Sequence, residues 1–98
     1  MRTVQVDLQD GFQDDEVVVR LEGEEVARLA GVTTNLVISR AASAVIQAPE
    51  GPCALEVELP SRGLRASVSL DAHAAFVMVN ATEGHLEAAV SPDEPLYL

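Results

Sequence analysis

Residues 53–70, CALEVELPSRGLRASVSL, contain the clearest strand pattern of the chain. Apolar residues occupy every second position before and after the central PSRG segment, and polar or small residues occupy the others. A period of two is typical of a strand with one face in the core and the other in water. Proline and glycine between the two halves are turn residues. The stretch therefore predicts an antiparallel hairpin with strands over 53–59 and 64–70.

Two side-chain placements follow from this hairpin. Cys53 is in phase with Leu55, so its thiol should point inward, where it acts as a small hydrophobe. Arg65 belongs to the polar face and should stand across from Glu56 or Glu58. Such a surface pair contributes only about a few tenths of a kcal/mol.

The rest of the chain repeats the alternation in shorter pieces separated by turn signals. Residues 25–30 contain good helix formers, yet VARLAG at 26–31 echoes VVRLEG at 18–23, as the two arms of a hairpin would. We therefore expect a strand there, after a II′ turn at Gly23 and Glu24. Residues 75–80 are apolar on both faces, which indicates a central strand. Further strands are expected over 3–8, 16–22, 34–39, 44–48 and 85–90.

Seven to nine short strands without a convincing helix predict an all-β fold, an antiparallel β-sandwich of the general kind to which immunoglobulin-like domains belong. Residues 1–98 are expected to form a single domain, since the length suits one core and no linker interrupts it. Antiparallel hairpins should dominate, because no connection is long enough for a crossover helix. The pattern leaves the strand order open.

The charge of the chain excludes several partners. The formal net charge is −10, and all six basic residues are arginines. Binding to nucleic acid or to an anionic membrane needs a basic footprint, so neither is expected. Basic proteins and cations remain as partners. Arginine without lysine, together with many alanines and valines, suggests a bacterial source.

The compartment is predicted from the same composition. Cys53 is the only cysteine, so an intramolecular disulfide is excluded. The start MRTVQVDLQD has no apolar run suited to a signal peptide, and no stretch approaches the ~20 apolar residues of a membrane span. We expect a protein of the reducing cytoplasm.

The stretch DLQDGFQDDE, residues 7–16, is the first candidate site because it concentrates carboxylates beside a glycine. It is not an EF-hand: counted from Gly11, the ligand positions of that loop fall on Val6, Leu8, Asp10 and Val17, and only one of the four is acidic. A looser calcium site from Asp10, Asp14, Asp15 and Glu16 stays open. The alternative is a solvated turn, in which Phe12 folds back over the end of the core.

Other residues with chemical potential carry weaker signals. A catalytic Cys53 would need an activating base, and the two histidines stand alone, His73 in a small-residue connection and His85 at the start of a strand. Both are read as surface histidines rather than as zinc or Fe(II) ligands. The chain has no nucleotide-binding or hydrolase motif. We therefore expect no catalytic residue and no cofactor.

Two segments could serve association. Residues 61–65, SRGLR, form a local positive spot that we read as a charged hairpin turn, with contact to an acidic face of another copy as the alternative. The tail is more suggestive. Leu96, Tyr97 and Leu98 place three apolar residues together after Pro95, where they should cover a sandwich edge or dock on a neighbour.

The order of strands, with VVVRLEG (17–23), GVTTNL (31–36), GPCALEVELPSRG (51–63) and DEPLYL (93–98), resembles an uncharacterised family of small bacterial proteins of about this length. The resemblance covers essentially the whole chain. Proteins of that kind are similar in architecture to the prealbumin-like (transthyretin-like) sandwiches. The resemblance implies a fold and no activity. Transthyretin-related hydrolases end in Tyr-Arg-Gly-Ser, whereas this chain ends in Pro-Leu-Tyr-Leu, so that activity is not supported.

The expected function is that of a small non-catalytic interaction or accessory module, with a homo-oligomer as one form. Its partner would be a protein or a second copy of the chain, without nucleic acid or membrane. The alternative is a calcium-binding module through the acidic loop at 7–16. An enzyme is the least supported class.

Overall fold

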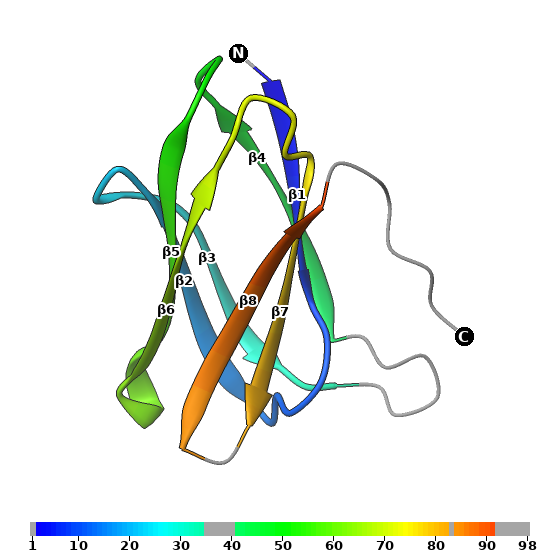
Figure 1. Ribbon diagram of the computed structural model, residues 1–98. Coiled ribbons are helices and arrows are strands. Elements are labelled where there is room, and N and C mark those ends of the chain that lie inside the picture. The colour runs from blue at the N-terminus through cyan, green and yellow to red at the C-terminus, as the bar shows by residue number, and fades with distance from the viewer. Residues whose placement is uncertain (1, 35–40, 83, 92–98) are drawn as a thin grey trace.

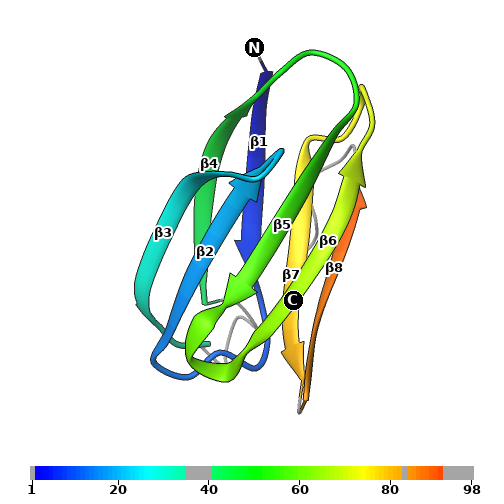
Figure 2. The ribbon, with the colours of Figure 1, turned by 90° about the vertical axis from the view of Figure 1, so that its left-hand side faces the viewer.

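A computed structural model describes residues 2–34, 41–82 and 84–91. Two four-stranded sheets pack face to face (Figure 1): sheet A has the order β4-β1-β7-β8 and sheet B the order β3-β2-β5-β6. Figure 2 looks onto sheet B, with sheet A behind it. The predicted all-β sandwich is thereby confirmed. The strands are β1 (Arg2–Leu8), β2 (Asp15–Leu21), β3 (Glu24–Val32), β4 (Ala42–Ala48), β5 (Cys53–Leu59), β6 (Leu64–Leu70), β7 (Phe76–Thr82) and β8 (His85–Ser91).

The β5–β6 hairpin forms as its sequence predicts. All seven residues of β5 pair with β6, from Cys53 opposite Leu70 to Leu59 opposite Leu64. The turn is the short 3-10 helix η1 (Pro60–Arg62), which ends at Gly63 with a left-handed φ of 66°. Arg65 stands opposite Glu58, and its Nη2 lies 3.1 Å from Glu58 Oε2.

The β2–β3 hairpin confirms the strand expected over 25–30 and corrects its turn. The loop is Glu22-Gly23, one residue earlier than expected, and both residues have positive φ, 49° and 82°. Positive φ at both central positions is the geometry of a type I′ turn, not II′. Pairing shifts between Asp15 and Val17 and between Val19 and Arg20, so β3 carries extra residues as bulges.

One strand pair departs from the antiparallel expectation. β1 runs parallel to β7, with Gln5 opposite Phe76 and Leu8 opposite Val79. The expectation considered only crossovers that return to the same sheet through a helix. Here the connection alternates between the layers: β2 and β3 lie in sheet B, β4 returns to sheet A on the other side of β1, β5 and β6 lie in sheet B, and β7 returns to sheet A beside β1. The result places β1 in the interior of sheet A, between β4 and β7.

The core lies between the sheets and consists of aliphatic side chains. Val6, Leu8, Val57 and Val77 are among those that lie fully buried. β7 is an inner strand of sheet A, as its two-sided apolar sequence predicts. Phe12 is 3% exposed and joins the core from the loop after β1, which confirms that it folds back over the end of the sandwich. The strand expected over 34–39 falls outside the described residues except for its first, Thr34.

Candidate functional site

The acidic loop after β1 is a hydrogen-bonded junction between the two sheets. On the sheet A side, the Asp10 amide donates to Asn80 Oδ1 at 3.0 Å, and the Ala81 amide donates to the Asp10 carbonyl at 2.8 Å. On the sheet B side, Thr34 closes a pair of bonds with Phe12: the Phe12 amide donates to Thr34 Oγ1 at 3.0 Å, and the Thr34 amide donates to the Phe12 carbonyl at 2.9 Å. These hydrogen bonds satisfy backbone groups of the loop and hold it in a single conformation between the two sheets.

Gly11 makes this junction possible. Its φ is +88°, a conformation that residues with a Cβ rarely adopt. A Cβ at this position would lie 2.7 Å from the Ala81 carbonyl carbon and would overlap the attached oxygen. The glycine that completes the acidic motif is therefore needed for the approach of the loop to the end of β7, which is a structural reason for its presence.

Asp15 forms the strongest single contact of the candidate cation site, and its partner is an arginine. The Arg62 guanidinium makes a bidentate contact with the carboxylate: Nε donates to Oδ1 at 3.0 Å and Nη2 donates to Oδ2 at 2.6 Å. The same Nη2 donates to the Gly11 carbonyl at 2.9 Å. The Asp15 side chain is only 4% exposed and that of Arg62 32%. This bidentate pair ties η1 to the acidic loop.

The four cation candidates therefore do not act as one group. Asp15 is bound by Arg62, and Glu16 by Arg28, whose Nη1 lies 2.7 Å from Glu16 Oε1. Asp10 and Asp14 are exposed at opposite ends of the loop. Within residues 2–34, 41–82 and 84–91, no three His, Cys, Asp or Glu side chains gather closely enough to hold a metal ion. The geometry favours the solvated, structured turn.

Cys53 and the two histidines lie apart from one another. Cys53 is a buried free thiol in the core, as its phase in β5 predicts. His73 lies just before β7 and His85 just after it, at opposite ends of a seven-residue strand that spans roughly 20 Å. His85 is exposed, and its Nε2 lies 3.1 Å from Glu87 Oε1. One ion could not contact both imidazoles.

The outer face of sheet B carries a network of ion pairs. Arg20 Nη1 contacts Glu56 at 3.1 Å and Glu58 at 2.8 Å, and Arg28 contacts Glu25 at 2.7 Å. The hydrogen bond from Arg20 lowers the pKa of the Glu58 carboxyl, and the hydrogen bond from Arg28 lowers that of Glu25. The charges of this face are matched side by side, so it offers no basic patch to an anion.

Val18 lies beneath this network. In the register it stands opposite Glu58 on one side and Arg28 on the other, so it points to the outer face of the sheet. It is nevertheless 0% exposed. The long aliphatic stems of neighbouring charged residues account for this burial, since such stems cover apolar surface while their charged ends stay in water. The two-sided apolar centre of this strand, evident in the sequence, is thereby explained.

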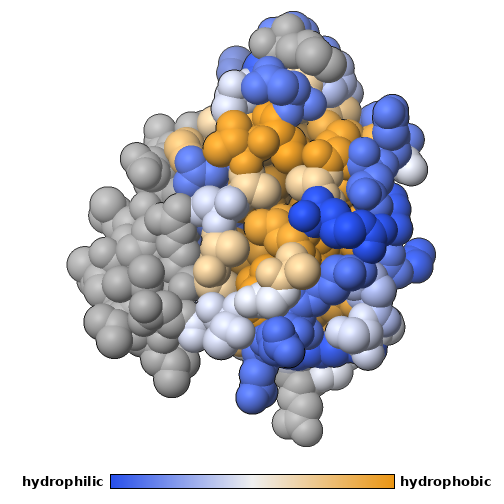
Figure 3. Space-filling model, turned by 180° about the vertical axis from the view of Figure 1, so that it is seen from behind, coloured by the Kyte–Doolittle hydropathy of each residue, from blue (hydrophilic) through white to orange (hydrophobic). Residues whose placement is uncertain are grey.

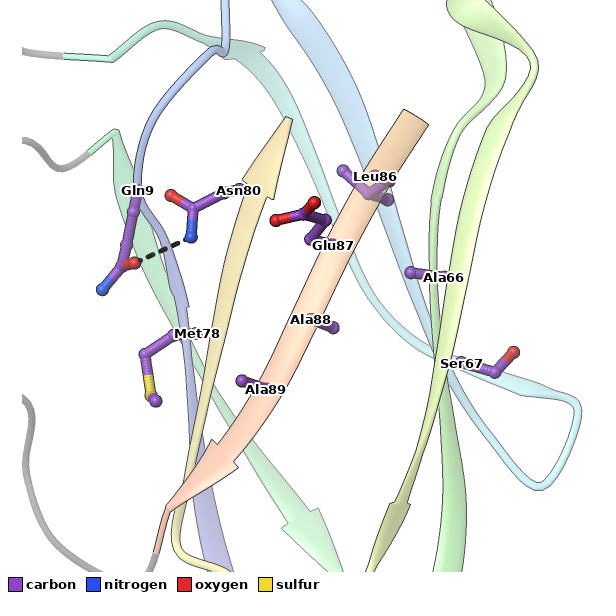
Figure 4. Close-up of a pocket in the computed structure, with 9 residues that line it drawn as sticks. All are labelled: Gln9, Ala66, Ser67, Met78, Asn80, Leu86, Glu87, Ala88 and Ala89. Atoms are coloured by element: carbon purple, nitrogen blue, oxygen red, sulfur yellow. Dashed lines mark hydrogen bonds between the residues drawn. The ribbon is translucent and has the colours of Figure 1, made fainter. Parts of the chain in front are cut away.

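A shallow hollow of about 790 Å³ runs along β8 where it passes β6. Figure 4 shows Gln9, Met78 and Asn80 on one flank of β8 and Ala66 and Ser67 on the other. Two of its polar side chains are held within the fold: Asn80 Nδ2 donates to Gln9 Oε1 at 3.1 Å, while Asn80 Oδ1 accepts from the Asp10 amide in the loop after β1. The hollow is an open surface depression lined by β6, β7, β8 and Gln9, without a converging set of reactive groups.

The opposite side of the sandwich, where β3 passes β4, is more apolar. Ala27, Leu29, Ala41 and Ala42 are only partly buried there. Figure 3 looks at this side and shows hydrophobic surface bordered by hydrophilic residues. Val45, in the middle of β4, is 63% exposed.

The exposed large hydrophobic side chains of the described residues all lie on edge strands. Val26 is on β3, Val45 on β4 and Val90 on β8. Sequence reasoning did not single them out, because alternation identifies a strand and cannot tell which strand ends a sheet. The absence of charge in ASAVIQA, the sequence of β4, was the signal that could have found this edge.

The association segments predicted from the sequence divide into two cases. In the tip at 61–65, Arg62 binds Asp15 and Arg65 binds Glu58 of the same chain, so this positive spot is neutralised internally. Leu96, Tyr97 and Leu98 lie outside the described residues.

No family model, curated protein or solved structure matches the chain. No helix in the described ranges is long and apolar enough to cross a membrane.

Proposed function

We propose that this chain is a non-catalytic interaction module that binds a protein partner, or a second copy of itself, through the edges of its sandwich. The observation that carries the proposal is the distribution of exposed apolar residues. Val26, Val45 and Val90 lie on three different edge strands, where unpaired backbone groups can accept another strand.

The positions of the reactive side chains support the non-catalytic part of the proposal. Asp15 and Glu16 are bound to arginines, Cys53 is buried among aliphatic residues, and His85 contacts Glu87. A catalytic site brings nucleophile, base and substrate into one accessible place. These groups instead hold the fold together or stand alone.

A prealbumin-like architecture and a cytoplasmic location belong to the same proposal. Two four-stranded sheets, with the first and seventh strands side by side and parallel, support the architecture. The free thiol of Cys53 supports a reducing compartment. We propose no cofactor and no nucleic-acid or membrane partner, in keeping with the net charge of −10.

The experiment compares the chain with a variant in which Val26, Val45 and Val90 are all replaced by glutamate. Self-association is measured by sedimentation velocity from about 10 μM to about 1 mM, which covers weak affinities. Partner binding is measured by capture from an extract of the cells that make the protein. We expect the variant to lose association in at least one readout while its circular dichroism remains that of the folded chain. Equal behaviour in both readouts would refute the proposal.

Deletion of 95–98 tests the tail separately. If Leu96, Tyr97 and Leu98 contribute to an interface, the truncated chain should sediment as a smaller species at equal concentration. An unchanged sedimentation coefficient would remove the tail from the proposal and leave the sheet edges.

A further inference from the structure

The edge of β4 lacks the devices that normally prevent edge strands from pairing. Its sequence contains no charged residue and no proline, and all seven of its residues pair with β1 in unbroken register from Ala42 to Ala48. Its central residue, Val45, is 63% exposed. Monomeric proteins commonly protect such edges with charges, prolines or bulges.

The other three edges carry such protection. β3 has two acids at its start, Arg28 in its middle and two bulges. β8 carries Glu87, and β6 carries Arg65 and packs beside β8. β4 is thus a long, regular and uncharged edge on a chain whose other edges are guarded.

The charge of the molecule indicates which surface a second copy could approach. Two chains of net charge −10 repel each other, and contact through acidic faces would add local repulsion. β4 and the apolar side next to it form a surface on which contact brings no carboxylate of either strand against another. Self-pairing is least opposed there.

We infer that β4 pairs antiparallel with β4 of a second copy around a two-fold axis at Val45, joining the two A sheets into one continuous sheet. The inference rests on the proposed function and specifies its surface and its partner. The strand is self-complementary in this register. Val45 meets Val45 of the second copy, Ala44 meets Ile46, and Ser43 meets Gln47.

The two faces of the joined sheet match this register. In the pairing with β1, Ala44 stands opposite Val6 and Ile46 opposite Val4, both fully buried, so these two β4 residues belong to the core side. Apolar side chains therefore meet apolar ones on the inner face. On the outer face an amide meets a hydroxyl on each side of the central valines, and such polar cross-strand pairs are favourable.

The dimer is expected to be weak and to strengthen with salt. A contact through one seven-residue strand falls at the low end of specific interfaces, below about 1,200 Å². Added salt shortens the Debye length from about 10 Å at 0.1 M to about 3 Å at 1 M and screens the repulsion between the chains. An association dominated by opposite charges would weaken instead.

The test replaces Val45 with glutamate and uses Val26→Glu and Val90→Glu as matched controls, since each adds the same charge to an exposed valine of another edge. Sedimentation velocity up to about 1 mM should show a dimer for the unmodified chain and both controls, and an affinity about tenfold or more lower for Val45→Glu. Equal weakening by all three variants would show a charge effect alone and overturn the inference.

A second measurement fixes the register. Residues directly opposite in an antiparallel pair have Cβ atoms about 5 Å apart, close enough for a disulfide after a small adjustment. Val45→Cys should therefore cross-link two chains under mild oxidation, whereas Val26→Cys and Val90→Cys should not; the buried Cys53 is common to all three. Equal cross-linking of the three variants would contradict β4 pairing.

The outcomes separate this inference from the function on which it rests. If the chain stays monomeric at all concentrations and Val45→Cys does not cross-link, self-pairing is wrong, and the capture experiment alone decides the function. If Val45→Glu abolishes capture of a partner from a monomeric chain, the edge accepts a segment of another protein and the second-copy inference is overturned.

Discussion

Replacement of Gly11 by alanine should destabilise the sandwich far more than the same change at Gly51. Both glycines have a φ of +88°, so the backbone penalty of a Cβ in this conformation, about 1–2 kcal/mol, applies to each. They differ in their surroundings. A Cβ on Gly51 meets nothing within 4 Å, whereas one on Gly11 overlaps the Ala81 carbonyl.

The clash at Gly11 has a further free-energy cost, which can be estimated from the bonds it disturbs. The loop must move away from the end of β7, and this movement strains the bond from the Ala81 amide to the Asp10 carbonyl and the bond from the Asp10 amide to Asn80. Each such bond contributes about 1 kcal/mol. We therefore expect Gly11→Ala to lower the free energy of unfolding by about 2 kcal/mol more than Gly51→Ala.

The assay is urea unfolding followed by far-ultraviolet circular dichroism, with a thermal melt as the second readout. In a domain of this size, a difference of about 2 kcal/mol corresponds to a melting temperature about 8–16 °C lower for Gly11→Ala than for Gly51→Ala. Equal destabilisation by the two variants would show that the loop does not lie tightly against β7, and the account of the acidic junction would be wrong.

Three other predictions follow from the contacts of charged residues. Arg62→Met should lower the free energy of unfolding by about 2 kcal/mol, because the buried carboxylate of Asp15 loses its bidentate partner; this is less than the roughly 3–5 kcal/mol expected for a fully buried pair. Arg65→Met, at a 65% exposed site, should lower it by about 0.5 kcal/mol at most. Equal losses in urea titrations would contradict the bidentate contact between Arg62 and Asp15. The hydrogen bond from Arg20 holds the pKa of Glu58 below 4.5, so the stability it adds is present above that pH and is lost as the pH falls through the lowered pKa. The difference in free energy of unfolding between the wild type and Glu58→Gln should therefore shrink on acidification. A difference that grew would contradict the lowered pKa. Melts in EDTA, excess calcium and excess magnesium should agree within about 2 °C; a rise of about 10 °C or more with calcium alone would re-establish the acidic loop as a cation site.

Local sequence patterns predicted the strands and several placements within them. The alternation around Leu55 and Val57 gave the β5–β6 hairpin, the phase of Cys53 placed its thiol in the core, and the apolar Phe12 in an acidic turn was recognised as a cover for the core. Each of these depends on neighbours within a few residues, where the period of two carries the information.

Features set by distant segments could not be read in this way. Asp15 and Arg62 are 47 residues apart, and nothing local to either indicates that they meet. Gly23 was recognised as a turn residue, but the positive φ of Glu22, which moves the turn by one position, depends on the twist of the hairpin. The uncharged sequence of β4 became informative only after its position at the edge of sheet A was known.

The parallel pairing of β1 with β7 has a consequence for how the chain acquires its structure. Gln5 pairs with Phe76, about 70 residues later in the chain, so β1 has no neighbour on its β7 side until that residue has been synthesised. At synthesis rates of about 5–20 residues per second, β1 leaves the ribosome about 4–14 s before its partner exists. Sheet B can assemble during that interval, because all of its pairings are antiparallel and it does not include β1. β4 can pair with β1 in the same interval, since all seven of its residues stand opposite that strand. Addition of β7 to the other side of β1 is then the step that closes sheet A, and until it occurs Val6 and Leu8 lie on a strand with one unpaired side.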